Sequence, residues 1–121
     1  MQKKFKKPYV CVIGGLNIDL QGSSDKPLVL NDSNPGEIAM SAGGVGRNIA
    51  ENIAKLNIHS KILSYAGNDP LGDFVIDQSR ASNVDMSLVK IRSDLPTSQY
   101  LSMLDDNNDM LVSISDMRII D

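Results

Sequence analysis

The apolar residues fall in short blocks, and the blocks nearest the N-terminus predict strands. Residues 9–13 form an unbroken run of β-formers closed by two glycines, which is typical of a strand buried on both faces, with Cys11 packed inside it. Residues 16–20 alternate apolar and polar side chains, the pattern of a half-exposed strand. A surface loop over 22–36 and a short returning strand over 37–40 are predicted next.

The middle of the chain predicts two helices. Residues 41–46 are too rich in glycine for the interior of a strand or a helix. A helix is expected to follow at once, with Asn57 as its C-cap, and a second helix is expected over 72–81. The first helix has one apolar face, made by residues at spacings of four, four and three: Val45, Ile49, Ile53 and Leu56.

The remaining blocks predict four more strands. Residues 61–66 and 86–91 are expected to be strands next to the two helices. Residues 98–104 and 110–114 are rich in β-formers and flank the polar run 105–109, which predicts a hairpin. Strands that alternate with helices indicate an α/β layered fold with a mainly parallel sheet. The alternating strands near Asp19 and Tyr100 would form a second, smaller sheet.

Composition bounds the class of protein. The chain has 121 residues, 41% of them hydrophobic, which is enough for one globular domain with a core. Its net charge of -3 gives no electrostatic footprint for DNA or RNA, and the lysines at positions 3, 4, 6 and 7 are interpreted as a solvated tail. A single cysteine excludes an internal disulfide, and no apolar run is long enough to span a membrane. We therefore expect a soluble, cytoplasmic protein.

The segment Gly43-Gly44-Val45-Gly46-Arg47-Asn48 is the first candidate for chemistry, because it opens a helix whose N–H groups are unpaired. Three interpretations are open. A dinucleotide fingerprint would need glycine where Ile49 stands, and a P-loop would need Gly-Lys-Ser/Thr where Arg47-Asn48 follows. The third interpretation is a glycine-rich turn that only begins a helix.

Asn17 and Asp19 are the second candidate. Side chains two residues apart on a strand point to the same face, and an amide beside a carboxylate can clasp adjacent hydroxyl groups. The alternative is a solvated strand face. The other polar residues predict surface roles: His59 near a helix end, Asp69, Asp73 and Asp77 beside a helix, and residues 105–109 in a turn rather than a calcium loop. No metal site is expected.

These residues carry a resemblance. The segment from Gly43 to Ala50, followed by Gly67, resembles the N-terminal signature of the ribokinase-like (PfkB) carbohydrate and nucleoside kinases, and Val12 to Asp19 resembles the first strand of that family. Asn57 departs from the signature, which has glycine or serine there. The resemblance extends from Tyr9 onward. Three stretches resemble most the branch that phosphorylates pseudouridine: 32–36, 46–56 and 97–111.

The resemblance implies a ribokinase-like fold with a β-sheet lid over roughly 16–41 and 97–115. It implies that Asp19 holds sugar hydroxyls with help from Asn17, and that Asn48 adds another contact. Gly43 and Gly44 would let the backbone reach the sugar and act as a hinge. Two further residues, Arg47 and Ser98, are expected to face a nucleoside. The lid also forms a homodimer contact in many members.

The resemblance also implies that part of the kinase is missing. Family members carry a glycine-rich anion hole, a catalytic aspartate and most of the nucleotide pocket in their C-terminal half, but this chain has no glycine after Gly72. We therefore expect 1–121 to be the N-terminal part of one such domain, inactive alone, from a kinase that transfers phosphate from Mg-ATP to the 5′-hydroxyl of pseudouridine. The alternatives are a kinase of another nucleoside or a ribose-like sugar, and a non-catalytic binding or dimerisation fragment.

Overall fold

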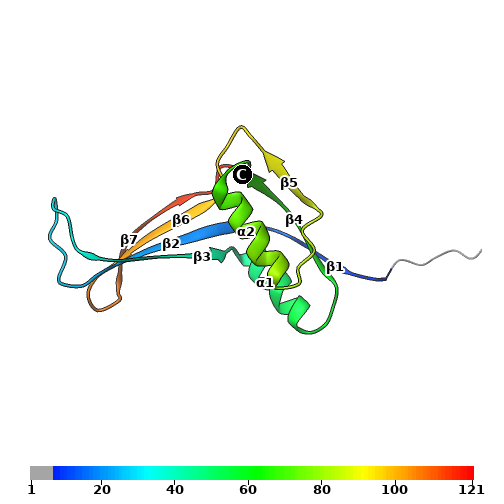
Figure 1. Ribbon diagram of the computed structural model, residues 1–121, viewed down its shortest axis with the longest axis horizontal. Helices are drawn as coiled ribbons and strands as arrows, with labels where there is room; N and C mark the ends of the chain where they lie inside the picture. Colours follow the sequence, from blue (N-terminus) through cyan, green and yellow to red (C-terminus); the bar gives the residue numbers. More distant parts are fainter. Residues whose placement is uncertain (1–6) are drawn as a thin grey trace, which may run out of the picture.

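The computed structural model describes residues 7–121, which form two sheets and two helices (Figure 1). The α/β layered fold predicted from the sequence is therefore confirmed. The elements in chain order are β1 (Val10–Ile13), β2 (Asn17–Ser24), β3 (Gly36–Gly43), α1 (Val45–Lys55), β4 (Ser60–Gly67), α2 (Pro70–Ala81), β5 (Val89–Arg92), β6 (Gln99–Leu104) and β7 (Met110–Asp116).

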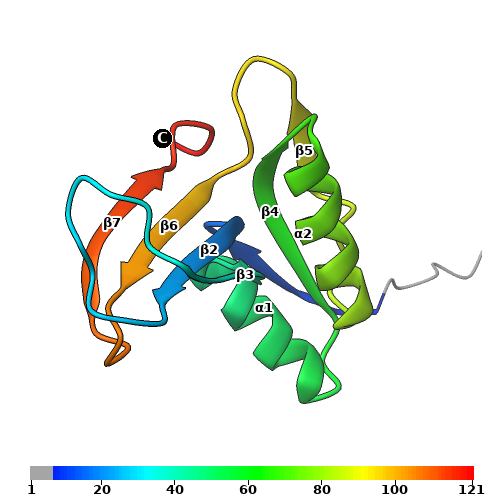
Figure 2. The same ribbon diagram turned by 60° about the vertical axis from the view of Figure 1, so that its left-hand side comes forward.

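The first sheet is parallel and has the strand order β1-β4-β5. Both helices lie against one face of it, and Figure 2 shows α1 below and to the left of α2. Alternate residues of the strands meet the helices on that face and leave the other face uncovered by any described element. The core formed there consists of Val12, Leu16, Ile18, Ala50, Ile62, Ala66, Val75, Val84 and Met86.

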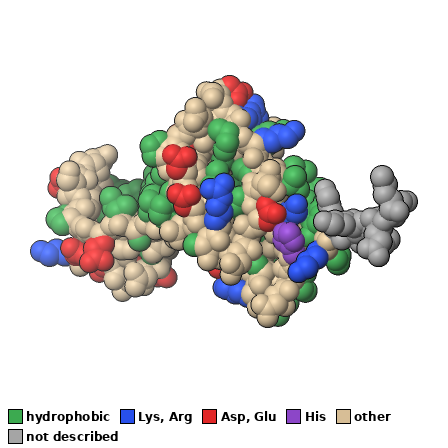
Figure 3. Space-filling view, turned by 45° about the vertical axis from the view of Figure 1, so that its right-hand side comes forward, with side chains coloured by type: hydrophobic (Ala, Val, Ile, Leu, Met, Phe, Trp, Pro, Cys, Tyr) green, Lys and Arg blue, Asp and Glu red, His purple; other side chains and the backbone are tan. Residues whose placement is uncertain are grey.

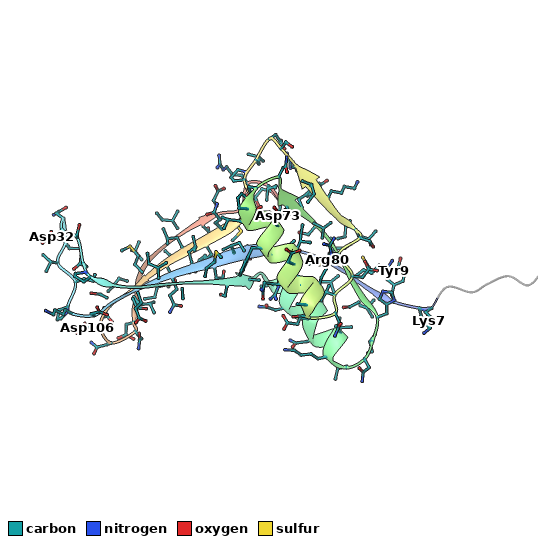
Figure 4. All side chains as sticks on the ribbon, in the orientation of Figure 1. Lys7, Tyr9, Asp32, Asp73, Arg80 and Asp106 are labelled. Atoms are coloured by element: carbon teal, nitrogen blue, oxygen red, sulfur yellow. The ribbon has the colours of Figure 1, made fainter. Side chains whose placement is uncertain are left out.

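The second sheet has the order β3-β2-β6-β7 and extends away from the helices; we call it the lid. In it β2 pairs antiparallel with β3 and parallel with β6, which in turn pairs antiparallel with β7. The hairpin predicted at residues 105–109 is confirmed, since Asp105 N donates to Asp109 O at 2.9 Å. The acidic residues Asp32 and Asp106 lie at the far tip of the lid, where solvent surrounds them (Figure 4).

The prediction that the first strand is buried on both faces is wrong. Only Val12 is buried in β1, whereas Ile13 is 78% exposed and Cys11 is exposed. The register pairs Cys11 with Lys61 and Ile13 with Leu63, so all four side chains share the face that carries no helix. Because both helices cover the same side, the apolar run has only one buried face within residues 7–121.

The apolar residues of α1 that were predicted to form its core face are largely exposed. Val45 is 75% exposed and Leu56 is 71% exposed, while Gly46, Arg47 and Ala50 are the buried residues of the helix. A Cβ atom on Gly46 would lie 2.8 Å from the carbonyl carbon of Gly14. The helix therefore approaches the sheet most closely at Gly46, and of its predicted apolar stripe Ile53 packs against the core whereas Val45 and Leu56 are turned away.

Several boundaries differ from the predictions. The strand β3 runs to Gly43, so residues 41–43 are strand although their glycine content argued against it. Helix α2 begins at Pro70, because Asp69 caps it. The C-cap of α1 is Leu56, and Asn57 follows it with a left-handed φ of 60°. The strand expected over 86–91 is the shorter β5.

The surface positions predicted for His59 and Lys7 agree with the structure. His59 is exposed and its Nε2 lies 3.3 Å from Asp85 Oδ2. Of the N-terminal lysines, Lys7 is exposed, and the other three lie outside the described residues. Neither helix in the described part of the chain is long and apolar enough to cross a membrane.

Asp69 joins the lid to the layered part of the fold. Its Oδ1 accepts from Gly72 N at 2.8 Å and from Thr97 Oγ1 at 2.6 Å, and its Oδ2 accepts from Thr97 N at 2.9 Å. Thr97 Oγ1 also accepts from Gly67 N at 2.8 Å. The end of β4, the start of α2 and the entry to β6 therefore meet at one carboxylate, which the sequence had suggested was only a first-turn acid.

We predict that Asp69→Ala lowers the free energy of unfolding by about 1–3 kcal/mol, because it removes a helix cap and leaves buried Thr97 without its partner. Asp77→Ala, at an exposed position of the same helix, is the matched control. Burial favours the neutral acid, but hydrogen bonds from Thr97 and Gly72 lower the pKa of Asp69 overall. The stabilisation is therefore present at neutral pH and is lost as the pH falls below the ordinary carboxyl pKa toward the lowered one.

Urea unfolding of the two variants and the wild type across pH checks this. Equal stability of the Asp69→Ala and Asp77→Ala variants at pH 7 would contradict it.

Candidate substrate-binding site

A paired amide and carboxylate stand at the start of β2. Asn17 Nδ2 donates to Asp19 Oδ1 at 2.7 Å. Asn17 is buried and Asp19 is half-buried, so the amide fixes the carboxylate from the protein side while the carboxylate stays accessible. The predicted placement of both side chains on one strand face is confirmed by this bond. A carboxylate fixed in this way can accept hydrogen bonds from neighbouring hydroxyl groups.

Gly43 and Gly44 complete the wall beside this pair. The register places Gly43 opposite Asn17, and a Cβ atom on Gly43 would collide with Asp19 Oδ2. Gly44 has a φ of 103°, and a Cβ atom there would lie 2.5 Å from Gly15 O and 2.8 Å from Asn17 Oδ1. Gly44 therefore requires glycine, whereas a side chain at Gly43 would have to displace the Asp19 carboxylate; the polar pair borders the space that both glycines leave.

Helix α1 begins directly at this wall. It has no side-chain cap at its N-terminus, and its first-turn Arg47 N donates to Gly15 O at 3.0 Å. The amino end of a helix favours negative charge and hydrogen-bond acceptors. Asn48 is exposed in the same turn, and its side chain makes no hydrogen bond with Asn17 or Asp19 in the structure. The structure thus brings four of the five candidate residues into contact and leaves Asn48 beside them.

The expectation that Arg47 faces a nucleoside is wrong. The side chain is buried: its Nε donates to Ser79 Oγ at 3.0 Å, and its Nη1 donates to Ala42 O at 3.2 Å. Nη1 also lies 3.1 Å from Glu51 Oε2. The guanidinium therefore joins α1 to α2 and β3.

Ser98 lies closer to the site than Arg47 does. Ile18 N donates to Ser98 O at 2.9 Å, which places Ser98 alongside Asn17, one step before the register pair of Ile18 and Gln99. Its side chain is fully buried, and Oγ has no hydrogen-bond partner among the described residues. Ser98 therefore lies beneath the paired amide rather than on the exposed face of the lid.

A hollow of about 350 Å³ opens next to the site on the face of the parallel sheet that carries no helix. Gly15 belongs to it and also contacts the Gly44 position, so the hollow and the polar pair share one wall. From the sequence, Gly14-Gly15 was interpreted as the end of the first strand and not as part of a site. Two adjacent glycines were the one sequence feature that could have pointed to a close backbone approach there. The lining residues are Ile13, Gly14, Gly15, Leu63, Ser64, Tyr65, Lys90 and Ile120.

Comparison with known proteins decides the family. The model of the pfkB family carbohydrate kinases matches residues 7–118, nearly the whole chain. The chain belongs to this family. The resemblance found in the glycine segment and the first strand is therefore confirmed.

Individual proteins similar to this chain are also named as kinases. Pseudouridine kinase of Escherichia coli K12 is 45% identical over 114 residues, which cover 94% of this chain and 36% of that protein. Guanosine-inosine kinase of Exiguobacterium acetylicum is 33% identical over 106 residues, which cover 88% and 35%. The structure of Arabidopsis thaliana ribokinase complexed with ribose and ATP matches with a TM-score of 0.82 at 21% identity, over 92% of this chain and 36% of that one, and shows that the fold is ribokinase-like.

The chain therefore spans about a third of the length of the curated kinases it matches.

We predict that Gly43→Ala weakens sugar or nucleoside binding at least about tenfold, because the new methyl group would push the Asp19 carboxylate out of its place. Gly22→Ala is the matched control on the same sheet, since a Cβ atom there meets nothing within 4 Å. Calorimetric titration of the full-length protein with pseudouridine and with ribose measures the effect, and thermal melting monitors folding. Equal affinities of a folded Gly43→Ala variant and the control would contradict the prediction.

Proposed function

We propose that this chain is the acceptor-binding part of an ATP-dependent kinase that phosphorylates the 5′-hydroxyl of pseudouridine. The observation that carries the proposal is the Asn17–Asp19 pair held against Gly43 and Gly44 at the start of α1. The 45% identity to pseudouridine kinase of Escherichia coli over nearly the whole chain supports this substrate above others. A cytoplasmic location fits a nucleoside kinase with one cysteine.

In this proposal the described residues position the acceptor. Asp19 accepts hydrogen bonds from two neighbouring sugar hydroxyls, and Asn17 keeps the carboxylate from turning. The backbone at Gly43 and Gly44 approaches the sugar ring closely, and Asn48 reaches it from the first turn of α1. Fixing the sugar in this way holds the hydroxyl that reacts in one place, which is how binding energy lowers the barrier to phosphoryl transfer.

Residues 7–121 do not fit a site for the triphosphate of Mg-ATP. The amino end of α2 is already occupied by the Asp69 carboxylate, and the described residues contain no cluster of three or more His, Cys, Asp or Glu that could hold a metal ion. We propose that the catalytic base and the nucleotide site belong to further sequence of a longer protein, and that residues 1–121 are the N-terminal part of one ribokinase-like domain with its lid at about 16–41 and 97–115.

A kinase of another nucleoside or of a ribose-like sugar is the second candidate. The relative named guanosine-inosine kinase matches this chain over a similar share of its length, although at lower identity. The same Asp19 geometry would hold the hydroxyls of any ribose-like ring. A substrate panel of pseudouridine, uridine, guanosine and ribose separates these candidates.

The lid offers a surface for a second copy of the protein. Side chains along the lid strands alternate between two faces, and one face is apolar. This apolar face begins next to the core, where Leu20 pairs with Met40 and Leu101, and continues toward the tip with Ile38, Met103 and Val112. Ile38 is 83% exposed and Val112 is 53% exposed. Hydrophobic side chains gather on the lid between its tip and the helices (Figure 3). We propose that two lids pair through this face, which is also what a non-catalytic dimerisation module would do.

We predict that Asp19→Ala in the full-length protein lowers kcat/KM for pseudouridine by about two to four powers of ten, since two charge-assisted hydrogen bonds worth roughly 1.5–3 kcal/mol each are lost. Asp25→Ala, at an exposed position beyond the end of β2, is the matched control and should retain wild-type kinetics. A coupled kinase assay over the substrate panel measures both. Near-normal kinetics of Asp19→Ala would remove its assigned role.

We also predict that Met103→Glu gives a monomer, because it places a charge on the apolar lid face. Ser113→Glu, on the opposite face of the neighbouring strand, should leave a dimer. Sedimentation velocity at several concentrations measures the mass. A wild-type monomer at the highest concentration would contradict the pairing of lids.

A further inference from the structure

Tyr100 lies beside the candidate site, on the polar face of the lid. The parallel register of β2 and β6 places Tyr100 directly next to Asp19. Paired residues of neighbouring strands point to the same face of a sheet, so the tyrosine and the carboxylate share the face that carries the site. In the sequence this position belongs to a β-rich run and to one of the three stretches that resemble the pseudouridine branch of the family.

The ring of Tyr100 runs along the strand rather than out from it. Its hydroxyl donates to Met110 Sδ at 3.5 Å. Met110 pairs with Leu104, four residues further along β6, which is about 13 Å at the usual rise of a strand. The tyrosine side chain can reach that sulfur only by lying along the sheet toward the tip of the lid. The position between them, Ser102, is correspondingly only 8% exposed.

The surroundings of the ring are polar. Gln21 pairs with Ser102 and follows Asp19 by two residues, so its exposed side chain lies on the same face, on β2, whereas the ring of Tyr100 leans across β6 toward Met110 of β7. The register adds Ser41 next to Asp19 and Ser115 next to Tyr100. The ring of Tyr100 is half-buried on this face, among these small polar side chains. Such a surface suits a planar ring that also carries hydrogen-bonding groups at its edge.

We propose that Tyr100 determines specificity for a nucleoside by stacking on its base, and that the amide of Gln21 binds the edge of that base. This inference rests on the proposed function, in which Asp19 holds the sugar hydroxyls. A planar base on the sugar then extends from Asp19 toward the tip of the lid, in the direction of the tyrosine ring. A free sugar has no group that reaches this surface, so Tyr100 contributes to nucleoside binding and not to ribose binding.

Variants of the full-length protein test this. Tyr100→Leu should weaken pseudouridine binding and raise its KM about 5- to 150-fold, the range that stacking on an aromatic side chain gives, and leave ribose binding unchanged. Tyr100→Phe keeps the ring and should stay within about threefold of the wild type. Tyr9→Leu replaces an exposed tyrosine directly before β1, away from the lid, and is the matched control. Calorimetric titration with pseudouridine and ribose measures affinity independently of catalysis, and thermal melting verifies folding.

The outcomes are separable. Loss confined to pseudouridine in Tyr100→Leu supports the inference. Equal loss for pseudouridine and ribose, or no loss for either, overturns the stacking role while the proposed kinase function stands. A wild-type protein that binds and phosphorylates ribose but no nucleoside also overturns it, and leaves the sugar-kinase alternative. A wild-type protein that binds neither ligand overturns the proposed function and the inference together.

Discussion

The site depends on a close backbone approach between α1 and the turn after β1. Gly46 and Gly14 touch so closely that a methyl group on Gly46 would lie 2.8 Å from a backbone carbon, and Arg47 N bonds to Gly15 O at 3.0 Å. Protein interiors cannot absorb such overlap without backbone movement. This contact fixes where β3 ends and α1 begins. It thereby places Gly43 and Gly44 against the carboxylate of Asp19.

The two sheets divide the work of the molecule. The parallel sheet and its helices hold the core. The lid has a polar face that contains Asp19, and an apolar face that begins at the core with Leu20 and continues outward toward the tip. Asp69 and Thr97 join the two sheets through buried hydrogen bonds. A lid that is joined at its base and free along its length can carry a rigid polar face over a bound sugar. The proposed acceptor site uses this arrangement.

The sequence predicted the fold class, the lid strands and the Asn17–Asp19 pair, because strand alternation and glycine spacing are local signals. It failed for Cys11 and for the stripe of Val45 and Leu56, since local pattern does not say which face of an element is covered. It also misjudged Arg47 and Asp69. Their partners, Ser79 and Thr97, are 32 and 28 residues away, and only the folded chain brings them together.

The most direct test is a crystal structure of the full-length protein with pseudouridine bound. We expect two sugar hydroxyls within about 2.6–3.2 Å of the Asp19 carboxylate, beside the backbone of Gly43 and Gly44. We also expect a base stacked on Tyr100. A sugar bound away from Asp19, with the Asn17–Asp19 pair in contact only with solvent, would contradict the central claim that this pair is the acceptor site.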